Sequence, residues 1–393
     1  MRRGETAEVV VVGGGINGAS IAFHLAARGI TDVVVLERAY PGAGASSRGM
    51  GLLRTYHANE PEAVLAIRSL DVFRNWEERV GGSCGYVETG FLWLDTETAG
   101  ADVRRNIDLV NRNGGNARFL TGRELQGLQP HLDTDGIVAA YEPDSGYAYG
   151  APATDALLAA ARRLGVRLKT RTPATALLSS RGRVTGVVTP SGSISAGKVV
   201  LAAGAWTAPL AAAAGVELPI APRRLTIGRV YLPPGLRDAI TFLDAAVDTA
   251  FKPDGAQTAL ISARDSRYGT RVDPDLLAED VEFDAISRGI LKLARRMPDM
   301  KHAVGGRTWT GVDGFTPDYR GIYGAVDGCE GLLICAGASE KGFKVAPAVG
   351  MSMAELIDTG RCGILDGGTF SAHRFAGRRE RDRYEEVSVT DLI

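Results

Sequence analysis

Cysteine is scarce in this 393-residue sequence, which contains only Cys84, Cys329, Cys335 and Cys362. No two of them form a C-x-x-C pair, and no histidine lies at metal-ligand spacing from them. The sequence therefore predicts neither a disulfide framework nor a zinc site. So few unpaired thiols fit a reducing compartment.

An excess of charge of one sign is also missing. Lys+Arg 45 against Asp+Glu 46 leaves a formal net charge of -1, so no basic surplus exists to neutralise phosphates or anionic lipids. No apolar run approaches the roughly 18 residues that a membrane-spanning helix needs, and the start at Met1-Arg2-Arg3 shows no signal-peptide core. We therefore expect a cytoplasmic protein that binds neither nucleic acid nor membranes.

Glycine, in contrast, is abundant. The 50 glycines are nearly twice the average share of about 7%, and they indicate many tight turns and close backbone approaches. Apolar residues make up 45% of the chain and charged residues 23%, a composition that excludes global disorder. At about 150 residues per domain, the length predicts two or three domains.

The N-terminal segment carries a β-α-β pattern with a glycine-rich turn. Residues 9–12 form a β-branched run that is typical of a parallel strand buried on both faces. The sequence GGGING follows at 13–18, and a helix is predicted over 16–28. A second buried strand is predicted over 33–37.

Gly13, Gly15 and Gly18 have the spacing of a dinucleotide-binding turn. The first glycine permits the tight turn, the second lets the backbone approach a pyrophosphate, and the third allows close packing of the helix. Ile16 and Asn17 open that helix, whose N-terminal amides attract phosphate.

Glu37 ends the second strand, 19 residues after Gly18. A carboxylate at this position accepts hydrogen bonds from ribose hydroxyls and disfavours the 2′-phosphate of NADP. Strand, glycine turn, helix and carboxylate together predict a nucleotide site. The alternative interpretation is a glycine-rich structural turn.

Later segments resemble further parts of the same sheet. Strands are predicted at 166–170, 198–204 and 332–337, with an amphipathic helix at 154–164. Between them lie stretches with short alternating runs, in which Phe91 and Trp93 indicate packing within a sheet of mostly antiparallel strands and one or two helices. The predicted domains are a nucleotide-binding domain of residues 1–83, 149–217 and 305–393 and a second domain of residues 84–148 and 218–304. The charged tail at 378–386 is predicted to be a solvated helix or a loose end.

A second loop that enters a helix lies near the C-terminus. Residues 337–344 leave the last strand and enter a helix predicted over 345–358, with Pro347 in its first turn. The positive end of this helix suits the negative charge of a reduced flavin. An ordinary strand-turn-helix that closes the sheet is the alternative.

Four segments carry a family resemblance through their order and spacing. They are GGGING at 13–18 with Glu37-Arg38, GASSRGMGLLR at 44–54, LAAGAW at 201–206, and GGRTWTGVDGFTPDYRGIYG at 305–324 leading to AGASEKGFKVAPAVG at 336–350. Together they resemble the amine-oxidising flavoproteins that include D-amino acid oxidase, glycine oxidase and monomeric sarcosine oxidase. The resemblance covers nearly the whole chain, from about residue 8 to Phe375.

This resemblance implies an α/β fold: a discontinuous Rossmann-like FAD-binding domain with a second α+β substrate domain built on an antiparallel sheet. It implies FAD as the cofactor and a small amine, usually an amino acid, as the substrate. Cofactor contacts are carried over onto matching positions. The implied cofactor-binding residues are Gly13, Gly15, Ile16, Asn17, Gly18, Glu37, Arg38, Ser46, Ser47, Arg48, Met50, Gly51, Ala174, Ala203, Gly204, Trp206, Gly337, Gly342, Phe343 and Lys344.

Arg54 and Lys344 match the pair that grips the substrate carboxylate in the sarcosine-oxidising branch. The arginine fork matches a carboxylate, and a lysine adds a compact second charge. The alternatives are a structural ion pair for Arg54 and a surface lysine for Lys344. Arg307 falls where glycine oxidase-like members place a carboxylate-binding arginine, with bracing of the site as the alternative role. Tyr56 and His57 are further candidates to line the site.

Two departures from the family pattern change the expected chemistry. Trp309 replaces the cysteine that bonds the flavin in covalently flavinylated members, so noncovalent FAD is predicted. Ser262 stands where sarcosine-type oxidases place an oxygen-activating lysine, and residues 253–291 contain no lysine. Either another cation such as Lys341 takes this role, or the enzyme is a dehydrogenase that passes electrons elsewhere. For Lys341 itself, a solvent-facing surface position is the favoured alternative.

The expected activity is FAD-dependent oxidation of a small amine, either an amino acid or an N-substituted amino acid. Hydride leaves the carbon next to nitrogen for flavin N5 and an imine forms. The alternative enzyme is an FAD-dependent dehydrogenase of a 2-hydroxy acid or another anionic substrate, with His57 as the base. A non-catalytic flavoprotein and a dehydrogenase that uses only NAD are less favoured.

Overall fold

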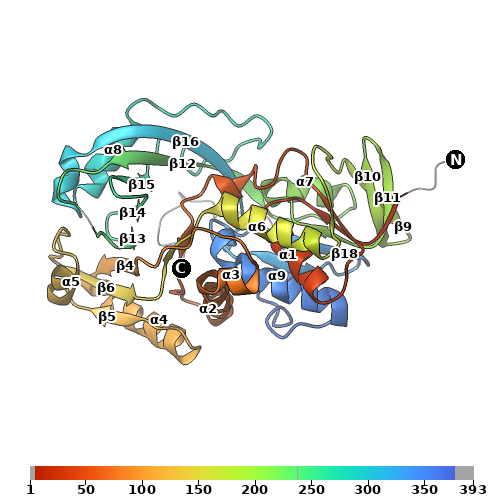
Figure 1. Ribbon diagram of the computed structural model, residues 1–393, viewed down its shortest axis with the longest axis horizontal. Coiled ribbons are helices and arrows are strands. Elements are labelled where there is room, and N and C mark those ends of the chain that lie inside the picture. The colour runs from red at the N-terminus through yellow and green to blue at the C-terminus, as the bar shows by residue number, and fades with distance from the viewer. Residues whose placement is uncertain (1–4, 237, 377–393) are drawn as a thin grey trace.

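Two eight-stranded sheets form the framework of the protein, and they lie at opposite ends of its long axis (Figure 1). The structure is a computed structural model that describes residues 5–236 and 238–376. The Met1-Arg2-Arg3 start and the predicted tail at 378–386 lie outside the described residues.

The first sheet is mainly parallel, in the order β17-β18-β11-β1-β2-β8, with β10 and β9 attached beside β11. Only β17, β10 and β9 pair antiparallel with their neighbours in it. The predicted parallel sheet is confirmed. Its strands are β1 (Glu5–Val12), β2 (Val33–Leu36), β8 (Arg167–Lys169), β9 (Ala176–Ser180), β10 (Arg183–Thr189), β11 (Gly192–Leu201), β17 (Ile322–Ala325) and β18 (Leu332–Ala336).

Both faces of this sheet are buried, as the continuous valine run at 9–12 predicts. Val9 and Val11 pack on one face with the helices, while Val10 and Val12 pack in a separate cluster on the other face. The helices on the first face are α1 (Ile16–Ala27), α2 (Glu60–Arg74), α3 (Trp76–Arg79), α6 (Gly150–Arg163) and α9 (Gly342–Thr359), and α7 (Thr207–Ala212) contributes to the second.

The second sheet has the order β16-β12-β15-β14-β13-β4-β6-β5, and every pair except β13 with β4 is antiparallel. Phe91 and Trp93 are fully buried in it, as predicted. Its strands are β4 (Phe91–Thr96), β5 (Arg118–Leu120), β6 (Ile137–Glu142), β12 (Ala221–Tyr231), β13 (Thr241–Asp244), β14 (Thr249–Pro253), β15 (Thr258–Ser262) and β16 (Val304–Phe315). The accompanying helices are α4 (Gly100–Arg112), α5 (Gly122–Leu128) and α8 (Ala285–Leu293).

Strand pairing extends the second sheet beyond the predicted boundary at residue 305. β16 pairs with β12 along its whole length, from Val304 to Phe315. The chain therefore leaves the second sheet at Phe315 and returns to the first sheet through β17. A separate short ladder pairs β3 (Leu52–Leu53) with β7 (Gly146–Tyr147). These two strands lie where the chain passes from the first sheet to the second and back again.

The predicted helix at 16–28 is found at Ile16–Ala27. Two other predicted helices begin earlier than expected: α6, predicted over 154–164, begins at Gly150, and α9, predicted over 345–358, begins at Gly342. Pro347 consequently lies inside the helix and not in its first turn, which corrects the prediction. A proline there supplies no amide to the carbonyl four residues earlier, that of Phe343.

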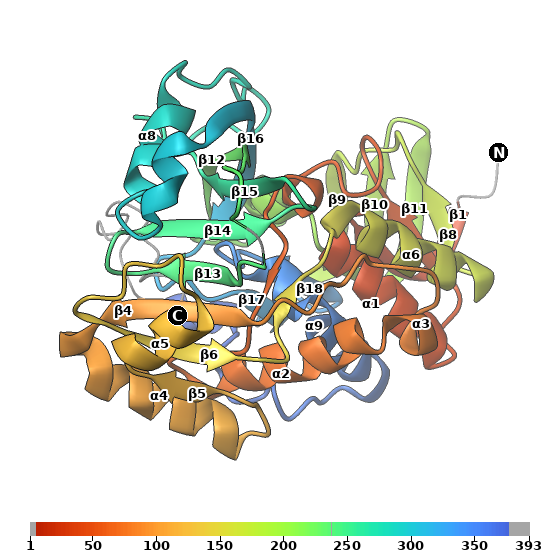
Figure 2. The same ribbon diagram turned by 60° about the vertical axis from the view of Figure 1, so that its left-hand side comes forward.

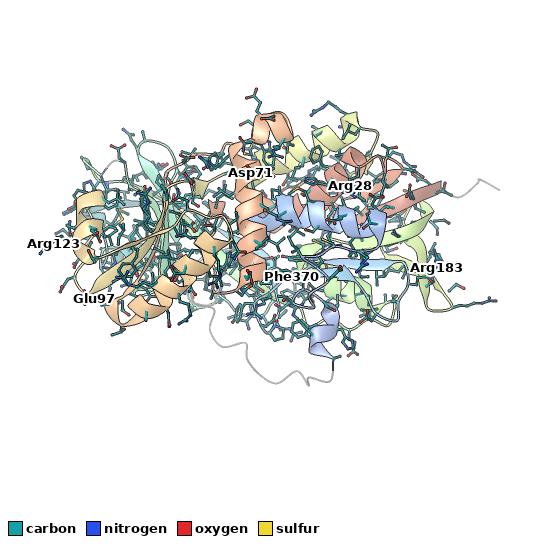
Figure 3. All side chains as sticks on the ribbon, turned by 90° about the horizontal axis from the view of Figure 1, so that it is seen from below. Arg28, Asp71, Glu97, Arg123, Arg183 and Phe370 are labelled. Carbon is teal, nitrogen blue, oxygen red and sulfur yellow. The ribbon has the colours of Figure 1, made fainter. Side chains whose placement is uncertain are left out.

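The long helix α2 crosses the junction of the two halves and contacts both α9 and α4. Figure 2 shows it beneath the end of the second sheet, and in Figure 3 it stands upright near Asp71 between the end with Arg123 and the end with Arg183. Within residues 5–236 and 238–376, no helix combines the length and apolar character needed to cross a membrane.

Candidate functional site

A long cavity of about 950 Å³ lies between the two sheets. One wall contains residues at the carboxyl ends of β1, β2 and β18, the edge at which open α/β sheets bind nucleotides. The facing wall comes from β12, β13, β14, β15 and β16 of the second sheet. A ligand in this cavity contacts both predicted domains.

The glycine-rich turn is held in place by backbone contacts that leave no room for a side chain. Gly13 has φ +114, and a Cβ there would lie 2.4 Å from the carbonyl oxygen of Ala202. A Cβ on Gly18 would lie 2.0 Å from the carbonyl oxygen of Gly13. Gly18 therefore packs α1 against the turn and does not line the cavity.

Glu37 lies at the end of β2 in the cavity wall and is buried. Its Oε2 accepts a hydrogen bond from the Gly14 amide at 2.9 Å, and its Oε1 accepts one from the Ala39 amide at 2.7 Å. Two amides thus fix the carboxylate beside the glycine turn, in the position that ribose recognition requires.

Residues far apart in sequence meet at the same end of the cavity. The Arg38 guanidinium lies 4.1 Å from the centre of the Trp206 ring. Asp275 accepts hydrogen bonds from Arg38 at 2.5 Å and from the Trp206 indole at 2.8 Å. Arg38 and Trp206 were expected as cofactor contacts, whereas Asp275 was not.

The loop after β2 forms the next part of the wall. Ser46 Oγ accepts a hydrogen bond from the Ile16 amide at 2.9 Å. Arg48 donates to the carbonyl of Thr310 at 3.1 Å, and the Trp309 indole donates to the carbonyl of Arg48 at 3.0 Å. Trp309 thus fixes this loop and is not in the cavity wall.

The expected cofactor residues coincide with the cavity wall except for Gly18 and Ser47, and Ser47 is exposed. Asn17 Oδ1 is buried with no hydrogen-bond partner in the described ranges, although Asn17 lines the cavity. An unpartnered buried acceptor next to a dinucleotide turn indicates that a ligand completes this wall. The residues that line the wall are Gly13, Gly15, Ile16, Asn17, Glu37, Arg38, Ser46, Arg48, Met50, Gly51, Ala174, Ala203, Gly204, Trp206, Gly337, Gly342, Phe343 and Lys344.

Two buried cations lie in the cavity wall. Arg54 and Lys344 both line the cavity and are 2% and 7% exposed. Burial lowers the pKa of Arg54 to about 10. Burial, with Arg54 and Lys341 nearby, lowers the pKa of Lys344 well below its usual value. An anion bound between them relieves this destabilisation of the two charges.

Arg54 is held from behind by the chain around it. One guanidinium nitrogen donates to the carbonyl of Tyr56, and the group lies 5.5 Å from the centre of the Trp93 ring. The buried carboxylate of Glu142 attracts Arg54 but accepts hydrogen bonds from the Thr55 amide and hydroxyl. These contacts fix the guanidinium in the wall.

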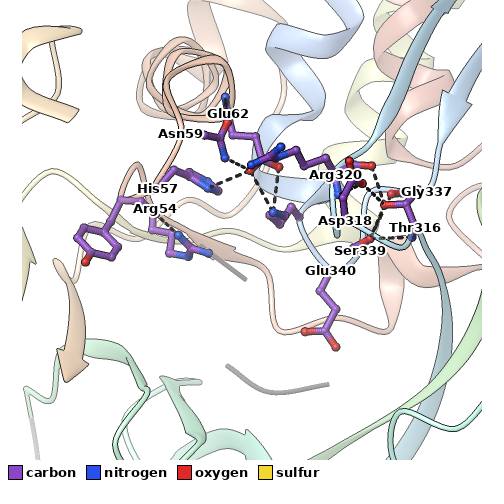
Figure 4. Close-up of polar contacts among 12 residues, drawn as sticks. Arg54, His57, Asn59, Glu62, Thr316, Asp318, Arg320, Gly337, Ser339 and Glu340 are labelled. Carbon is purple, nitrogen blue, oxygen red and sulfur yellow. Dashed lines mark hydrogen bonds and ion pairs between the residues drawn. The ribbon is translucent and has the colours of Figure 1, made fainter. Parts of the chain in front are cut away.

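Lys341 lies in a buried cluster behind the wall. Its ammonium is 2.9 Å from Glu62 Oε1, and the residue is 3% exposed, so the expected surface position is wrong. Figure 4 shows Glu62 at the centre of this cluster, with Asn59 and His57 as neighbours. Lys341 is buried because α2 brings Glu62 over the start of α9, where the carboxylate pairs with the ammonium.

Tyr56 and His57 do not line the cavity, in contrast to expectation. His57 is fully buried, its pKa is well below the usual value because of burial and nearby cations, and neither ring nitrogen has a hydrogen-bond partner in the described ranges. Tyr56 stacks on Trp93 with ring centres 5.3 Å apart, and burial raises its pKa to about 12. Tyr56 supports Arg54 through its backbone carbonyl, whereas His57 is buried outside the cavity wall.

Arg307 is exposed on β16 and does not line the cavity. It lies near the start of the strand, whereas Gly311, Val312 and Asp313 bring the later part of β16 to the wall. The structure therefore removes Arg307 from the set of residues near a substrate carboxylate.

The two lysines that flank the lysine-free segment, Lys252 and Lys292, are also not in the cavity wall. Lys252 lies in β14, is 1% exposed and is 3.2 Å from Asp254 Oδ1. Its ammonium lies 4.5 Å and 4.4 Å from the ring centres of Tyr147 and Tyr149. Ser262 does line the cavity, so the wall at this position carries a hydroxyl.

Three residues that the sequence did not single out also line the cavity: Arg264, Tyr268 and Glu340. Arg264 forms an ion pair with Asp248 and lies 4.4 Å from the centre of the Tyr268 ring. Tyr268 donates a hydrogen bond to Glu340 at 3.0 Å. Glu340 thus adds a carboxylate to the cavity that also contains Arg54 and Lys344.

The chain is similar to a known protein family and to several characterised proteins. The model of the FAD dependent oxidoreductase family matches residues 8–356. The 4-methylaminobutanoate oxidase (formaldehyde-forming) of Paenarthrobacter nicotinovorans is 28% identical over 392 residues, which cover 95% of this chain and 46% of that protein. The glycine oxidase of Geobacillus kaustophilus is 28% identical over 381 residues, with 94% and 98% covered.

Two further similarities bear on function. A mitochondrial pyruvate dehydrogenase phosphatase regulatory subunit of Mus musculus is 27% identical over 363 residues, covering 89% of this chain and 41% of that protein. Among solved structures, an L-proline dehydrogenase from P. horikoshii has a TM-score of 0.85 and 28% identity, covering 95% of this chain and 98% of that one. The chain thus spans less than half of two of these relatives and nearly all of the other two.

The family match runs from β1 to α9, and the cavity contains the glycine turn, the ribose-position carboxylate and the unpartnered Asn17 expected of a dinucleotide site. The chain therefore belongs to the FAD-dependent oxidoreductase family, and its cofactor is FAD.

Proposed function

We propose that this protein oxidises a small amine that also carries a carboxylate, such as an amino acid or an N-substituted amino acid. The observation that carries the proposal is the pair of buried cations, Arg54 and Lys344, in the wall of the cavity that also contains the cofactor residues. Three relatives are named for 4-methylaminobutanoate, glycine and L-proline, and each of these molecules carries both an amine and a carboxylate.

The residues of this chain bind and orient the substrate. Arg54 supplies a two-pronged hydrogen-bond donor and Lys344 a compact second charge, so the carboxylate is fixed at one point of the cavity. Fixing it limits the positions of the neighbouring C–H bond, and this positioning contributes much of the rate enhancement. When bound, FAD would accept a hydride from the carbon next to a neutral nitrogen, so an ammonium substrate first loses one proton to water. Hydride loss leaves an iminium cation, which water hydrolyses.

The alternative activity, oxidation of a 2-hydroxy acid with His57 as base, has less support. His57 is fully buried and lies outside the cavity wall. A general base must come within hydrogen-bond reach of the proton that it removes. A role without turnover is the second alternative, because one relative is named as a regulatory subunit.

Anaerobic mixing of the purified holoprotein with a panel of L-, D- and N-methyl amino acids tests the proposal. We expect at least one of them to bleach the visible flavin spectrum. On admission of air we expect slow recovery of the colour, because Lys341 is paired with Glu62 and Ser262 replaces the oxygen-activating lysine. Immediate recovery identifies an oxidase, bleaching by 2-hydroxy acids alone contradicts the amine proposal, and no bleaching by any compound favours a role without turnover.

We also propose that FAD is bound without a covalent link. Trp309 stands at the family's attachment position, and Cys335 is the cysteine that the described residues place in the wall. Burial raises the pKa of the Cys335 thiol, so it stays protonated and unreactive. Acid precipitation of the protein is expected to release the yellow colour into the supernatant. Colour that remains in the pellet contradicts this prediction, and a Cys335→Ser variant then shows whether that thiol is the link.

A further inference from the structure

Glu340 occupies an unusual backbone position in the cavity wall. It lies in the loop between β18 and α9, where Ser339 and Glu340 have φ angles of 51 and 64. Side chains other than glycine rarely adopt this left-handed region, and such residues gather at functional sites. Position 340 is therefore occupied by a glutamate although its backbone conformation favours glycine.

The surrounding chain holds this loop firmly. Asp313 accepts hydrogen bonds at 2.8 Å from the amides of Glu340 and Gly314. The Ser339 amide donates to the Gly314 carbonyl at 3.1 Å, and the Ser339 hydroxyl accepts from the Thr316 amide at 3.2 Å. The Asp313 carboxylate is used to position this loop, whereas the Glu340 carboxylate lies in the cavity wall.

Tyr268, in the loop after β15, orients the Glu340 carboxylate. Tyr268 donates to its Oε1 at 3.0 Å, and the Tyr268 ring is in turn covered by the Arg264 guanidinium. Figure 4 shows the side chain pointing away from the polar cluster around Glu62. Burial raises the pKa of Glu340, while Arg264 and Lys344 oppose the rise.

The charges in this part of the cavity match those of a zwitterion. Arg54 and Lys344 present two positive charges on the side of the first sheet, and Glu340 presents a negative charge in the same cavity. Arg264 is already paired with Asp248. A small amino acid carries both complementary charges within one molecule.

We propose that Glu340 determines substrate specificity by accepting hydrogen bonds from the protonated amino group, while Arg54 and Lys344 hold the carboxylate. The inference rests on the proposed function and narrows it to substrates bound as zwitterions. Quaternary ammonium compounds, which have no N–H, and carboxylates without an amino group bind weakly because they offer Glu340 no hydrogen-bond donor.

A matched pair of ligands tests this role without turnover. α-Aminoisobutyrate has no hydrogen on the carbon next to nitrogen and cannot be oxidised there, and pivalate replaces its ammonium by a methyl group. Calorimetric titration of the holoprotein is expected to show tighter binding of α-aminoisobutyrate. In Glu340→Gln, this affinity falls about tenfold or more, because a charged hydrogen bond is lost, and the affinity for pivalate stays the same or rises.

Further variants separate specificity from folding. Glu340→Gly suits the φ of 64 and should show the same selective loss. Tyr268→Phe retains the carboxylate but removes its donor, so a smaller loss in the same direction is expected. Glu330→Gln is the matched control, since Glu330 is an exposed carboxylate in the turn before β18, paired with Arg183. Flavin content and the melting temperature confirm that each variant is folded.

The outcomes are distinct. If Glu340→Gln weakens the binding of both ligands equally, Glu340 has a purely structural role and the proposal is overturned. Unchanged binding of both ligands overturns it as well. Failure of both ligands to bind the unaltered protein counts against the cationic anchor, and so against the proposed function itself. Selective loss of α-aminoisobutyrate supports both.

Discussion

Arg54→Ala lowers kcat/KM for a carboxylate-bearing amine by at least about a hundredfold, chiefly through a higher KM. Removing one partner of a buried, hydrogen-bonded charge pair costs about 3 kcal/mol or more, and each 1.4 kcal/mol is a factor of ten. Arg54 is 2% exposed and lines the cavity, so water does not readily replace it. Steady-state kinetics with the amine identified by flavin bleaching measure the effect.

The controls for this variant come from the same chain. Arg307→Ala removes an exposed arginine of β16 outside the cavity wall, and kcat/KM is expected to stay within about twofold, as for most surface changes. An amine analogue that lacks the carboxylate should lose little with Arg54→Ala. An unchanged KM, or an equal loss with the analogue, excludes Arg54 as the carboxylate anchor. A normal flavin content and melting temperature show that the loss of activity in Arg54→Ala does not come from unfolding.

The dinucleotide end of the site was predictable because its signals are local. Gly13, Gly15, Gly18 and Glu37 belong to one β-α-β unit, and the steric demands of that unit can be read from their spacing. Burial of Val9 to Val12 on both faces follows from the same short-range pattern. No distant contact is needed to place these residues.

Contacts between distant segments could not be predicted in this way. Asp275 reaches Arg38 and Trp206 from the loop between β15 and α8, and nothing in its local sequence marks that role. Lys341 appears as a polar residue near a helix start, yet Glu62 of α2 buries it as an ion pair. The burial of a charged side chain depends on the partner that folding supplies.

Glu340 and Arg307 show the limit of family resemblance. The segment around Glu340 was matched as a whole, but a left-handed φ at a glutamate appears only in the structure. Arg307 lies in another matched segment, yet it falls on an exposed part of β16. A matched motif fixes the backbone path well, and the direction of a side chain on a strand much less well.

Gly13→Ala should abolish FAD binding in the purified protein. A Cβ at this position would lie 2.4 Å from the Ala202 carbonyl oxygen and 2.7 Å from its carbon. Both atoms belong to the backbone after β11, so relief of the clash displaces either the glycine turn or the strand end. The φ of +114 adds strain for any L side chain. Flavin content per protein, measured from the visible spectrum, is expected to fall at least about tenfold.

Gly29→Ala provides a matched control within the same β-α-β unit. Gly29 also has a positive φ, +93, but a Cβ there meets nothing within 4 Å. This variant should therefore show the strain of the backbone alone, as a lower melting temperature with a normal flavin content. If Gly13→Ala retains full flavin, the close approach to Ala202 is not what shapes the pyrophosphate site. If both variants lose flavin equally, general destabilisation explains the loss, and only a difference between them assigns it to the contact at Ala202.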